Sequence, residues 1–475
     1  MSITALAFLA IYTVGIFLTF RNPYYGILTY IFEWHNHPPY FWWGDDLPEL
    51  PSFLGWSFLI AIVTLISFFM NKSKLQPLEK PYYKPAIWIA VIVVNMYLVS
   101  YAFAILPDSS SDKALEIFKM LIFFLLLVTL VRNYEDYKTM IWVLIVCVAH
   151  FGFIAMDGSN RDIGVIAPNA TEENALSAHV MAVLSFFGVY FLLSKKWGKA
   201  FVFLTAPLCL NLIILANSRA TMLGLVAIGI FAVILIPGKI RFVVILGLVA
   251  GTVLFFQLTE ESFLERQSTE TYTDGSATSR LHLWSGGMNM WKDHPMGVGG
   301  GGFPELSMDY VPEITKPKSQ HNTFVAVFTD WGFVGLILYL CFQGHIFLLT
   351  AKIKRTAKRY KQYPEMQKFI LETTAVQLAL IGLIGAGMFH SRQYAEVVYW
   401  LSGFAIILYN IQRNELAQLQ RNNFTREPET EQKAQVPKSA PTFQHEFDPR
   451  FLQFSLALIK KEIKLENLKH HLGEY

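Results

Sequence analysis

Long apolar runs recur along this 475-residue chain, and they constrain its fold more than any other feature. They occupy residues 3–20, 24–36, 53–70, 86–106, 114–131, 138–156, 174–194, 199–216, 219–236, 239–257, 322–350, 370–389 and 394–411. About 20 consecutive apolar residues are enough for a helix to cross the hydrocarbon core of a membrane. We therefore expect an all-α fold, a polytopic membrane helical bundle of 12 or 13 transmembrane helices.

The second run leaves the number of spans open. Residues 24–36 are few, and Glu33, His35 and His37 interrupt them, which is also typical of a re-entrant or tilted segment. The first run, residues 3–20, has no basic start and no clear cleavage site, so we expect a retained helix.

Composition supports a membrane protein and argues against several other classes. Charged residues make up 16% of the chain, whereas soluble domains carry about 25%. The net charge of +3 is too small to indicate a nucleic-acid partner. Cys147, Cys209 and Cys341 all fall within apolar runs, where we expect them to pack rather than form a disulfide framework.

Basic residues predict which side of the membrane each connection faces, because cytoplasmic connections are enriched in Lys and Arg. Every second connection is basic: these lie near residues 72–84, 132–138, 195–199, 239–241 and 352–368. The alternate connections are acidic or neutral: these are residues 33–52, 107–113, 157–173, 217–218, 258–321 and 390–393. We expect the second set to face outward, away from the cytoplasm.

This pattern divides the chain into two parts. Residues 1–411 form the transmembrane domain, and residues 412–475 form a cytoplasmic tail. The tail begins with a polar stretch, 413–444, that is typical of a linker. Residues 448–471 regain a helical period with interspersed lysines, which predicts an amphipathic helix that lies on the inner leaflet or packs on a partner.

The polar insert at residues 258–321 is the longest connection, and we expect a partly helical loop on the outer face of the membrane that carries the active site. Trp284 and Trp291 fit an amphipathic helix at the membrane interface. The glycine run at 297–302 has no preceding strand, which argues against a dinucleotide site. Gly299 either brings a backbone amide close to an anionic substrate or belongs to a hinge.

Four arginines on the outward side break the charge pattern: Arg161, Arg219, Arg280 and Arg392. A guanidinium stays charged and donates paired hydrogen bonds, so it suits a phosphate or pyrophosphate group. We expect Arg219 and Arg280 to bind such a group, with Arg161 and Arg392 as further candidates. The alternative is snorkelling or a structural ion pair, for example Arg161 with Asp162.

His321 stands where the insert re-enters the membrane. A histidine there is a candidate general base, or an interfacial residue that caps the following helix. His150, His179 and His345 are more typical of satisfied core residues, whereas His35, His37 and His390 are expected to face outward. The histidines lack the spacing of metal ligands, so we predict neither a metal nor a cofactor.

Four short motifs occur in one order along the chain. They are Asn217-Ser218-Arg219-Ala220, Ser279-Arg280-Leu281-His282-Leu283-Trp284, His294-Pro295-Met296-Gly297-Val298-Gly299 and Gln320-His321-Asn322-Thr323-Phe324. With one large outward loop between two late helices, this pattern resembles the O-antigen ligase and polymerase superfamily. Three N-terminal stretches are similar to exosortase-associated O-glycosylation ligases: Asn22-Pro23-Tyr24-Tyr25-Gly26, His37-Pro38 and Tyr40-Phe41-Trp42-Trp43-Gly44.

The resemblance implies a membrane glycosyltransferase that uses no metal. It implies transfer of a glycan from an undecaprenyl-pyrophosphate donor to a hydroxyl of a protein, lipid or glycan at the periplasmic face. The matching positions place Arg219 and Arg280 on the donor pyrophosphate and His321 on the acceptor hydroxyl or the donor. Trp284, Gly299, Arg161 and Arg392 are expected to contact substrate.

Two further hypotheses belong to other classes. A flippase for lipid-linked sugars also needs many spans and cationic residues, but it should carry charges deep in the bundle and show repeat symmetry. A membrane-anchored scaffold acting through the tail leaves Arg219, Arg280 and His321 without a role.

Overall fold

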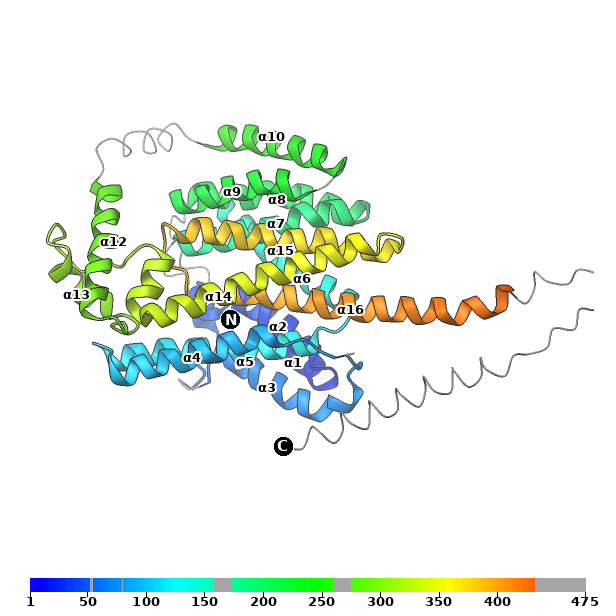
Figure 1. Cartoon of the computed structure of the whole chain (residues 1–475), viewed down its shortest axis with the longest axis horizontal. Helices are drawn as coiled ribbons and strands as arrows, with labels where there is room; N and C mark the ends of the chain where they lie inside the picture. The colour runs from blue at the N-terminus through cyan, green and yellow to red at the C-terminus, as the bar shows by residue number, and fades with distance from the viewer. Residues whose placement is uncertain (52–53, 79, 158–172, 237, 260–274, 432–475) are drawn as a thin grey trace, which may run out of the picture. The chain divides into compact units, whose positions relative to one another are not determined.

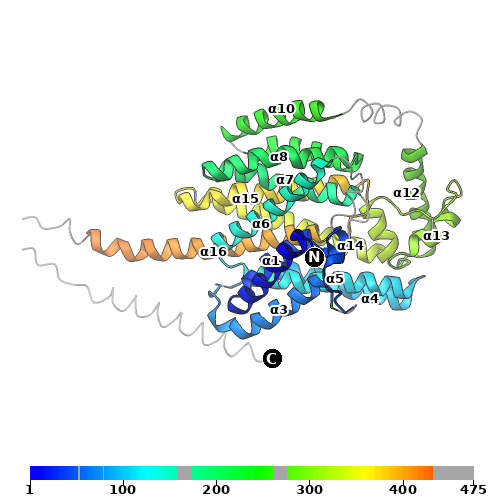
Figure 2. The same ribbon diagram turned by 180° about the vertical axis from the view of Figure 1, so that it is seen from behind.

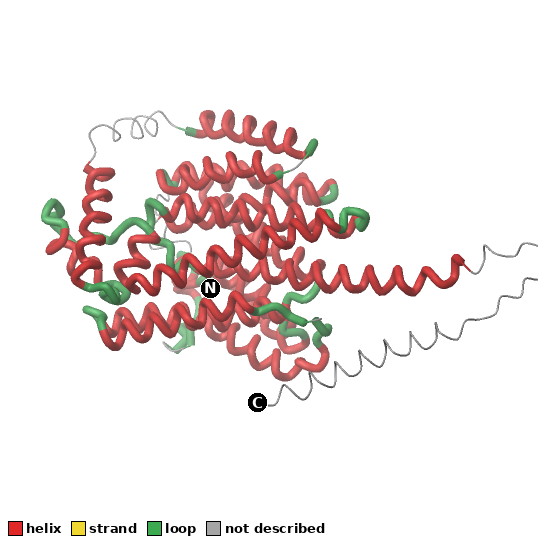
Figure 3. The backbone as a smooth tube through the Cα atoms, viewed as in Figure 1, coloured by secondary structure: helices red, strands yellow, loops and turns green. Residues whose placement is uncertain are grey.

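The computed structural model describes residues 1–51, 54–78, 80–157, 173–236, 238–259 and 275–431. Helices form all the regular structure in these residues, and no strand occurs among them (Figure 3). The helices that match the apolar runs are α1 (Ile3–Arg21), α2 (Tyr24–His35), α3 (Trp56–Asn71), α4 (Lys84–Ala102), α5 (Pro107–Leu130), α6 (Tyr134–Ile154), α7 (Glu173–Leu193), α8 (Lys196–Leu215), α9 (Arg219–Leu235), α10 (Ile240–Leu258), α14 (Thr323–Arg359), α15 (Lys368–Gly387) and α16 (Glu396–Glu431).

The remaining helices lie in connections. They are α12 (Gly275–Asp293) and α13 (Gly302–Tyr310), with the short 3-10 helices η1 (Pro38–Tyr40), η2 (Gly44–Asp46), η3 (Lys72–Lys74), η4 (Ala155–Asp157) and η6 (Pro364–Met366). The prediction that residues 258–321 are partly helical is therefore confirmed. α12 ends at Asp293, directly before the His294-Pro295 pair, because proline disfavours a helical conformation in the residue before it.

Nine helices in the described part of the chain are long and apolar enough to span a membrane: α1, α3, α4, α6, α7, α8, α10, α14 and α15. The protein is thus an all-α polytopic membrane protein, as predicted. α2 has 12 residues and is about 18 Å long, shorter than the roughly 30 Å of a hydrocarbon core. The expected total of 12 or 13 spans needs α5, α9 and α16 as well, with or without α2.

The polar start of the tail is helical instead of a linker over residues 413–431. α16 continues through them to Glu431. This stretch is rich in Glu, Gln, Leu, Ala and Arg, which favour helix and extend one that is already nucleated. Packing divides the chain into two units, Met1–Gln418 and Leu419–Tyr475. The expected amphipathic helix at 448–471 lies outside the described residues.

α15 lies at the centre of the first unit, where it packs against α7, α9 and α14 (Figure 1). Small residues allow the closest contact, since a Cβ on Gly224 of α9 would lie 2.6 Å from the carbonyl oxygen of Gly382 on α15. Such small residues let membrane helices approach closely. α10 packs along α8 and α9, and none of its own residues is buried, so it lies at one edge of the described unit.

α12 and α13 gather at the end of the bundle where α9 and α14 begin (Figures 1 and 2). α12 runs across the bundle helices there instead of along them, and it packs on α13 and α14. The candidate site is built at this end.

Candidate active site at the loop-bearing end of the bundle

The beginning of α14 is fixed by several side-chain hydrogen bonds. Asn322 caps this helix, because its side-chain oxygen accepts hydrogen bonds from the backbone amides of Phe324 (2.9 Å) and Val325 (3.1 Å). The Asn322 amide group also donates to the Met388 carbonyl at 3.0 Å, which ties α14 to the end of α15. The capping role considered for His321 thus belongs to Asn322.

Thr323 joins the same helix end to the connection between α15 and α16. Its hydroxyl donates to the His390 carbonyl at 2.9 Å and accepts from the Arg392 backbone amide at 2.9 Å. This connection is therefore held across the start of α14. His390 was not among the site residues expected from the sequence. It lies beside His321, with 6.1 Å between the two ring centroids.

His321 has a left-handed backbone conformation, with φ at 49°. This conformation is uncommon for a residue with a side chain, and such outliers concentrate at functional sites. Its ring is partly exposed, and its Nε2 lies 3.4 Å from the Ser319 hydroxyl. The backbone turns sharply here, so that the imidazole stands at the mouth of the bundle beside the start of α14.

α12 brings the second motif to the same place. The Trp284 indole donates from Nε1 to the Gln320 carbonyl at 3.0 Å, and its ring lies 6.1 Å from that of Phe389. Arg280 lies four residues earlier on α12 and hence on the same face of the helix. Trp284 therefore occupies the site as a positioning residue between α12 and the residue before His321.

A further cation lies beside Arg280. Lys318 Nζ donates to the hydroxyl of Ser279 at 3.3 Å. Lys318 was not among the candidates expected from the sequence, although it breaks the charge pattern of the outward connections just as the arginines do.

At the other end of α12, partial burial and a 2.8 Å hydrogen bond to Asp293 raise the pKa of Tyr310 to about 12. Tyr310 thus remains protonated and fastens α13 to α12.

Arg219 is the first residue of α9. Asn217 reverses the chain with φ at 46°, and the Ser218 hydroxyl then caps α9 by accepting from the Thr221 amide. The Thr221 hydroxyl also lies 2.8 Å from that of Ser177 on α7. One turn of helix therefore fixes Arg219 beside the beginning of α7.

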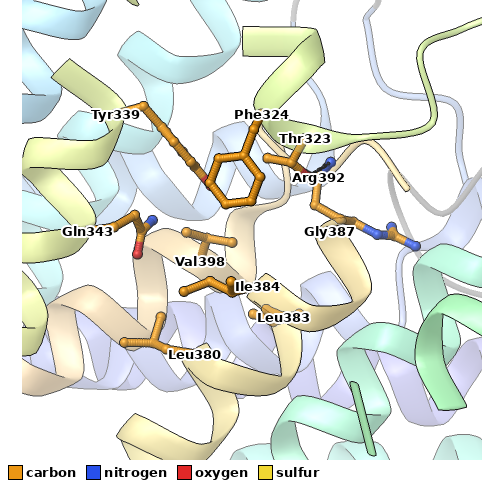
Figure 4. A pocket seen from close by; sticks show the side chains of 10 residues that line it. All are labelled: Thr323, Phe324, Tyr339, Gln343, Leu380, Leu383, Ile384, Gly387, Arg392 and Val398. Carbon is orange, nitrogen blue, oxygen red and sulfur yellow. Dashed lines mark hydrogen bonds between the residues drawn. The ribbon is translucent and has the colours of Figure 1, made fainter. Parts of the chain in front are cut away.

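The same part of α7 lies close to Arg392. The guanidinium of Arg392 is near enough for its charge to act on His179, two residues after Ser177. Arg392 and Phe324 both line a narrow cavity, and in Figure 4 the guanidinium end of Arg392 points away from the Phe324 ring. That cavity, of about 10 Å³, is large enough for about one water molecule. α7 thus connects the surroundings of Arg219 with those of Arg392.

His35 and His179 form a buried pair that the sequence did not predict. Their Nε2 atoms lie 3.0 Å apart, and His35 Nδ1 lies 2.7 Å from the carbonyl oxygen of Ile31. In the neutral pair His35 Nδ1 must donate, so His179 Nε2 donates to His35 and His179 Nδ1 is left as an acceptor. No hydrogen-bond partner reaches that atom within the described residues. Contacts with Phe151, His179 and Trp400 bury His35 completely, so its imidazole does not reach the surface of the bundle.

Asp330 is a buried residue whose carboxylate accepts hydrogen bonds from two parts of the site. Gln320 donates to its Oδ1 at 3.0 Å, and Tyr394 donates to its Oδ2 at 3.3 Å. Asp330 therefore connects the residue before His321 with the residues after Arg392. An ionisable residue inside an apolar run was the sequence signal that could have identified it.

Gly299 packs against the kink of α14. That kink lies at Gly332, where φ is 71°, and the Gly299 amide donates to the Asp330 carbonyl at 2.9 Å. The hinge considered for Gly299 is thus a fixed contact, and its amide already has a protein acceptor. Arg161 lies outside the described residues.

Part of the chain matches a known protein family. Residues 204–340 match the family model described as O-antigen ligase. This segment is an O-antigen ligase domain. A search of curated proteins found no match.

The O-antigen ligase domain extends from α8 to the middle of α14 and contains Arg219, Arg280 and His321. Two elements outside the matched segment contact it through hydrogen bonds: α7 from Ser177 to Thr221, and the α15–α16 connection from His390 and Arg392 to Thr323. The arrangement offers several cations and an imidazole at one end of an apolar bundle, which suits an anionic substrate anchored in a lipid layer.

Proposed function

We propose that the protein is a membrane glycosyltransferase that moves a glycan from an undecaprenyl-pyrophosphate donor to an acceptor hydroxyl at the periplasmic face. The observation that carries this proposal is that the O-antigen ligase domain contains Arg219, Arg280 and His321. Hydrogen bonds link the elements that carry these residues: α7 contacts α9, α12 contacts the residue before His321, and the α15–α16 connection contacts α14. A lipid-linked donor would enter from the bilayer with its diphosphate at the level of these cations.

The guanidinium groups would hold the donor. Arg219 and Arg280 would pair with the pyrophosphate, and Arg392 and Lys318 would add positive charge around it. Negative charge grows on the leaving pyrophosphate as the glycosyl bond breaks. Fixed cations in a site of low dielectric stabilise such charge, and guanidinium can do this without a metal.

His321 would act on the acceptor. The acceptor oxygen attacks the anomeric carbon and forms the new glycosidic bond, while the bond from that carbon to the pyrophosphate oxygen breaks. The imidazole takes the hydroxyl proton, and undecaprenyl pyrophosphate leaves with the bonding electron pair. Ser319 and His390 next to the ring would orient it.

Sidedness follows from the basic connections at the opposite end of the bundle. That charge pattern supports a periplasmic site and a cytoplasmic tail. A polymerase of the same superfamily would use the same residues with a growing glycan as acceptor. A flippase is less well supported, because the candidate cations gather at one end instead of along a path through the bundle.

The test uses cells that lack the gene and carry either the wild-type or a variant copy. Arg280→Ala and His321→Ala should each lower the transfer of the glycan roughly 100-fold or more, since a general base contributes about 10²–10⁴ and a charged transition-state donor about 10²–10³. The undecaprenyl-linked glycan should accumulate in both variants, as measured by mass spectrometry of extracted lipids.

Matched controls separate chemistry from folding. Lys292→Ala changes an exposed cation on the same helix as Arg280, and His294→Ala removes the imidazole at the end of that helix. Both controls should keep transfer within a few-fold of wild type at equal membrane levels. Full transfer by Arg280→Ala and His321→Ala at normal expression would exclude the proposed roles.

A further inference from the structure

A second cavity lies at the opposite end of the bundle from the candidate site. It measures about 340 Å³ and opens among the α1–α2, α3–α4 and α5–α6 connections. Residues from all three connections line it, including Arg21, Lys74, Gln76, Arg132 and Asp136. Its volume falls within the range of about 300–1,000 Å³ found for small-molecule sites.

The lining is positively charged. Arg21, Lys74 and Arg132 face a single carboxylate among the lining residues, that of Asp136. The Asp136 carboxylate is used locally, because Asn133 donates to it at 2.7 Å. Within the described part of the chain, none of the three cations forms an ion pair. The cavity therefore has an unbalanced positive charge.

Arg132 is held in place without an acid. Its Nε donates to the Thr129 carbonyl at 2.7 Å, and its Nη1 donates to the Gln76 carbonyl on the α3–α4 connection. Burial lowers the pKa of this guanidinium. The charge of a partly buried guanidinium that donates only to neutral carbonyls is stabilised when an anion binds its remaining N–H groups. A guanidinium fixed in this way favours phosphate.

One apolar side chain lies beside these cations. Leu75, which is partly exposed, lines the same cavity, so a ligand there would contact both charge and hydrocarbon. The basic connections predict that this end faces the cytoplasm, where a leaflet rich in anionic lipid attracts basic segments. A phosphate that carries an acyl-glycerol body fits this combination better than a free ion.

We propose that this cavity binds the headgroup phosphate of an anionic phospholipid from the inner leaflet. The α1–α2, α3–α4 and α5–α6 connections supply Arg21, Lys74 and Arg132 to that phosphate. The partly exposed Leu75 contacts the beginning of the acyl chains. The site lies away from Arg219, Arg280 and His321, and its occupancy does not depend on the transfer reaction.

The test is native mass spectrometry of the full-length protein released from nanodiscs of phosphatidylglycerol or phosphatidylcholine. Wild-type protein should retain one phosphatidylglycerol much more often than one phosphatidylcholine. Lys74→Gln and Arg21→Gln should each lower this retention about fivefold, the effect expected of one cation near a lipid surface. Both residues are exposed, so these variants should fold even if Arg132→Gln does not.

Lys72→Gln is the matched control, because Lys72 belongs to the same 3-10 helix as Lys74 but does not line the cavity. It should retain the lipid as wild type does. Equal losses from Lys72→Gln and Lys74→Gln, or equal retention of the two lipids, would overturn the proposal. So would inorganic phosphate at millimolar concentration that displaces phosphatidylglycerol completely, since this would indicate a soluble phosphate ligand.

Discussion

At the level of single residues, backbone conformation separates catalytic candidates from packing positions. His321 and Gly299 both have a positive φ, of 49° and 80°. At His321 the strained residue carries a partly exposed imidazole beside another histidine. At Gly299 the conformation brings the backbone against Ala104 and Ser110, so the absence of a side chain is what matters.

Gly299→Ala should therefore destabilise the protein and leave donor affinity unchanged in the folded fraction. A Cβ would lie 2.4 Å from the Ala104 Cβ. Left-handed backbone costs about 1–2 kcal/mol for alanine and overpacking about 1–3 kcal/mol, so we expect a loss of roughly 2–5 kcal/mol. Thermal unfolding in detergent measures it.

Gly251→Ala on α10 is the control, because a Cβ at this position would have no heavy atom within 4 Å. Alanine there should be neutral or stabilise the helix by about 0.5–1 kcal/mol. Weaker donor binding by Gly299→Ala with unchanged thermal unfolding would instead assign Gly299 to the substrate.

At the level of helices, the site depends on how helix ends are joined. The first turn of α14 is capped by Asn322 and fastened to the α15–α16 connection by Thr323. α12 approaches α13 and α14 through small residues, since a Cβ on Gly286 would lie 2.3 Å from Val311 and one on Gly287 3.0 Å from Val325. Thus two glycines on α12 allow the close approach at which Trp284 meets Gln320.

Thr323→Val keeps the shape of the side chain and removes both hydrogen bonds. The His390 carbonyl and the Arg392 amide each lose a buried partner, which should cost about 1–3 kcal/mol. We expect the protein to fold and transfer to fall roughly tenfold, because Arg392 and His390 are less firmly placed near His321. Complementation and thermal unfolding of the same samples distinguish the two effects.

Thr252→Val is a suitable comparison. Thr252 is on exposed α10, and its hydroxyl donates at 2.9 Å to the Leu248 carbonyl of its own helix. It should change neither transfer nor stability by much. A Thr323→Val protein that matched Thr252→Val in both measurements would show that the α15–α16 connection does not position the site.

At the level of the whole molecule, charge and packing divide the first unit into two functional ends. One end carries α12, α13 and the cations of the O-antigen ligase domain. The other carries the basic connections and the cavity lined by Arg132. α7 and α15 are buried between them and hold the two ends at a fixed separation.

The sidedness of these ends is directly testable. Alkaline phosphatase fused after Ser307 in α13 should be active, since that enzyme requires the periplasm, whereas a fusion after Lys358 near the end of α14 should be inactive. Fluorescent protein at the same two positions should give the complementary result. The reverse pattern would place the candidate site on the cytoplasmic side and remove it from the proposed donor.

Most of the fold could be predicted because its cause is local. The length and apolarity of each run require a helix in a membrane, where backbone groups must be satisfied within the segment. Residues 413–431 were mispredicted because, outside the apolar runs, a polar composition rich in helix formers is ambiguous between linker and helix. The motifs that contain Arg219, Arg280 and His321 were likewise visible as short strings of residues.

The sequence alone therefore determined the membrane helices, the alternation of basic connections and the residue types offered for chemistry. Only the tertiary structure decided which of these residues meet. It buried His35 against His179, gave Asp330 its partners from Gln320 and Tyr394, and used Gly299 for packing. These outcomes depend on contacts between residues distant in the chain, and no pattern of neighbouring residues encodes how helix ends approach each other.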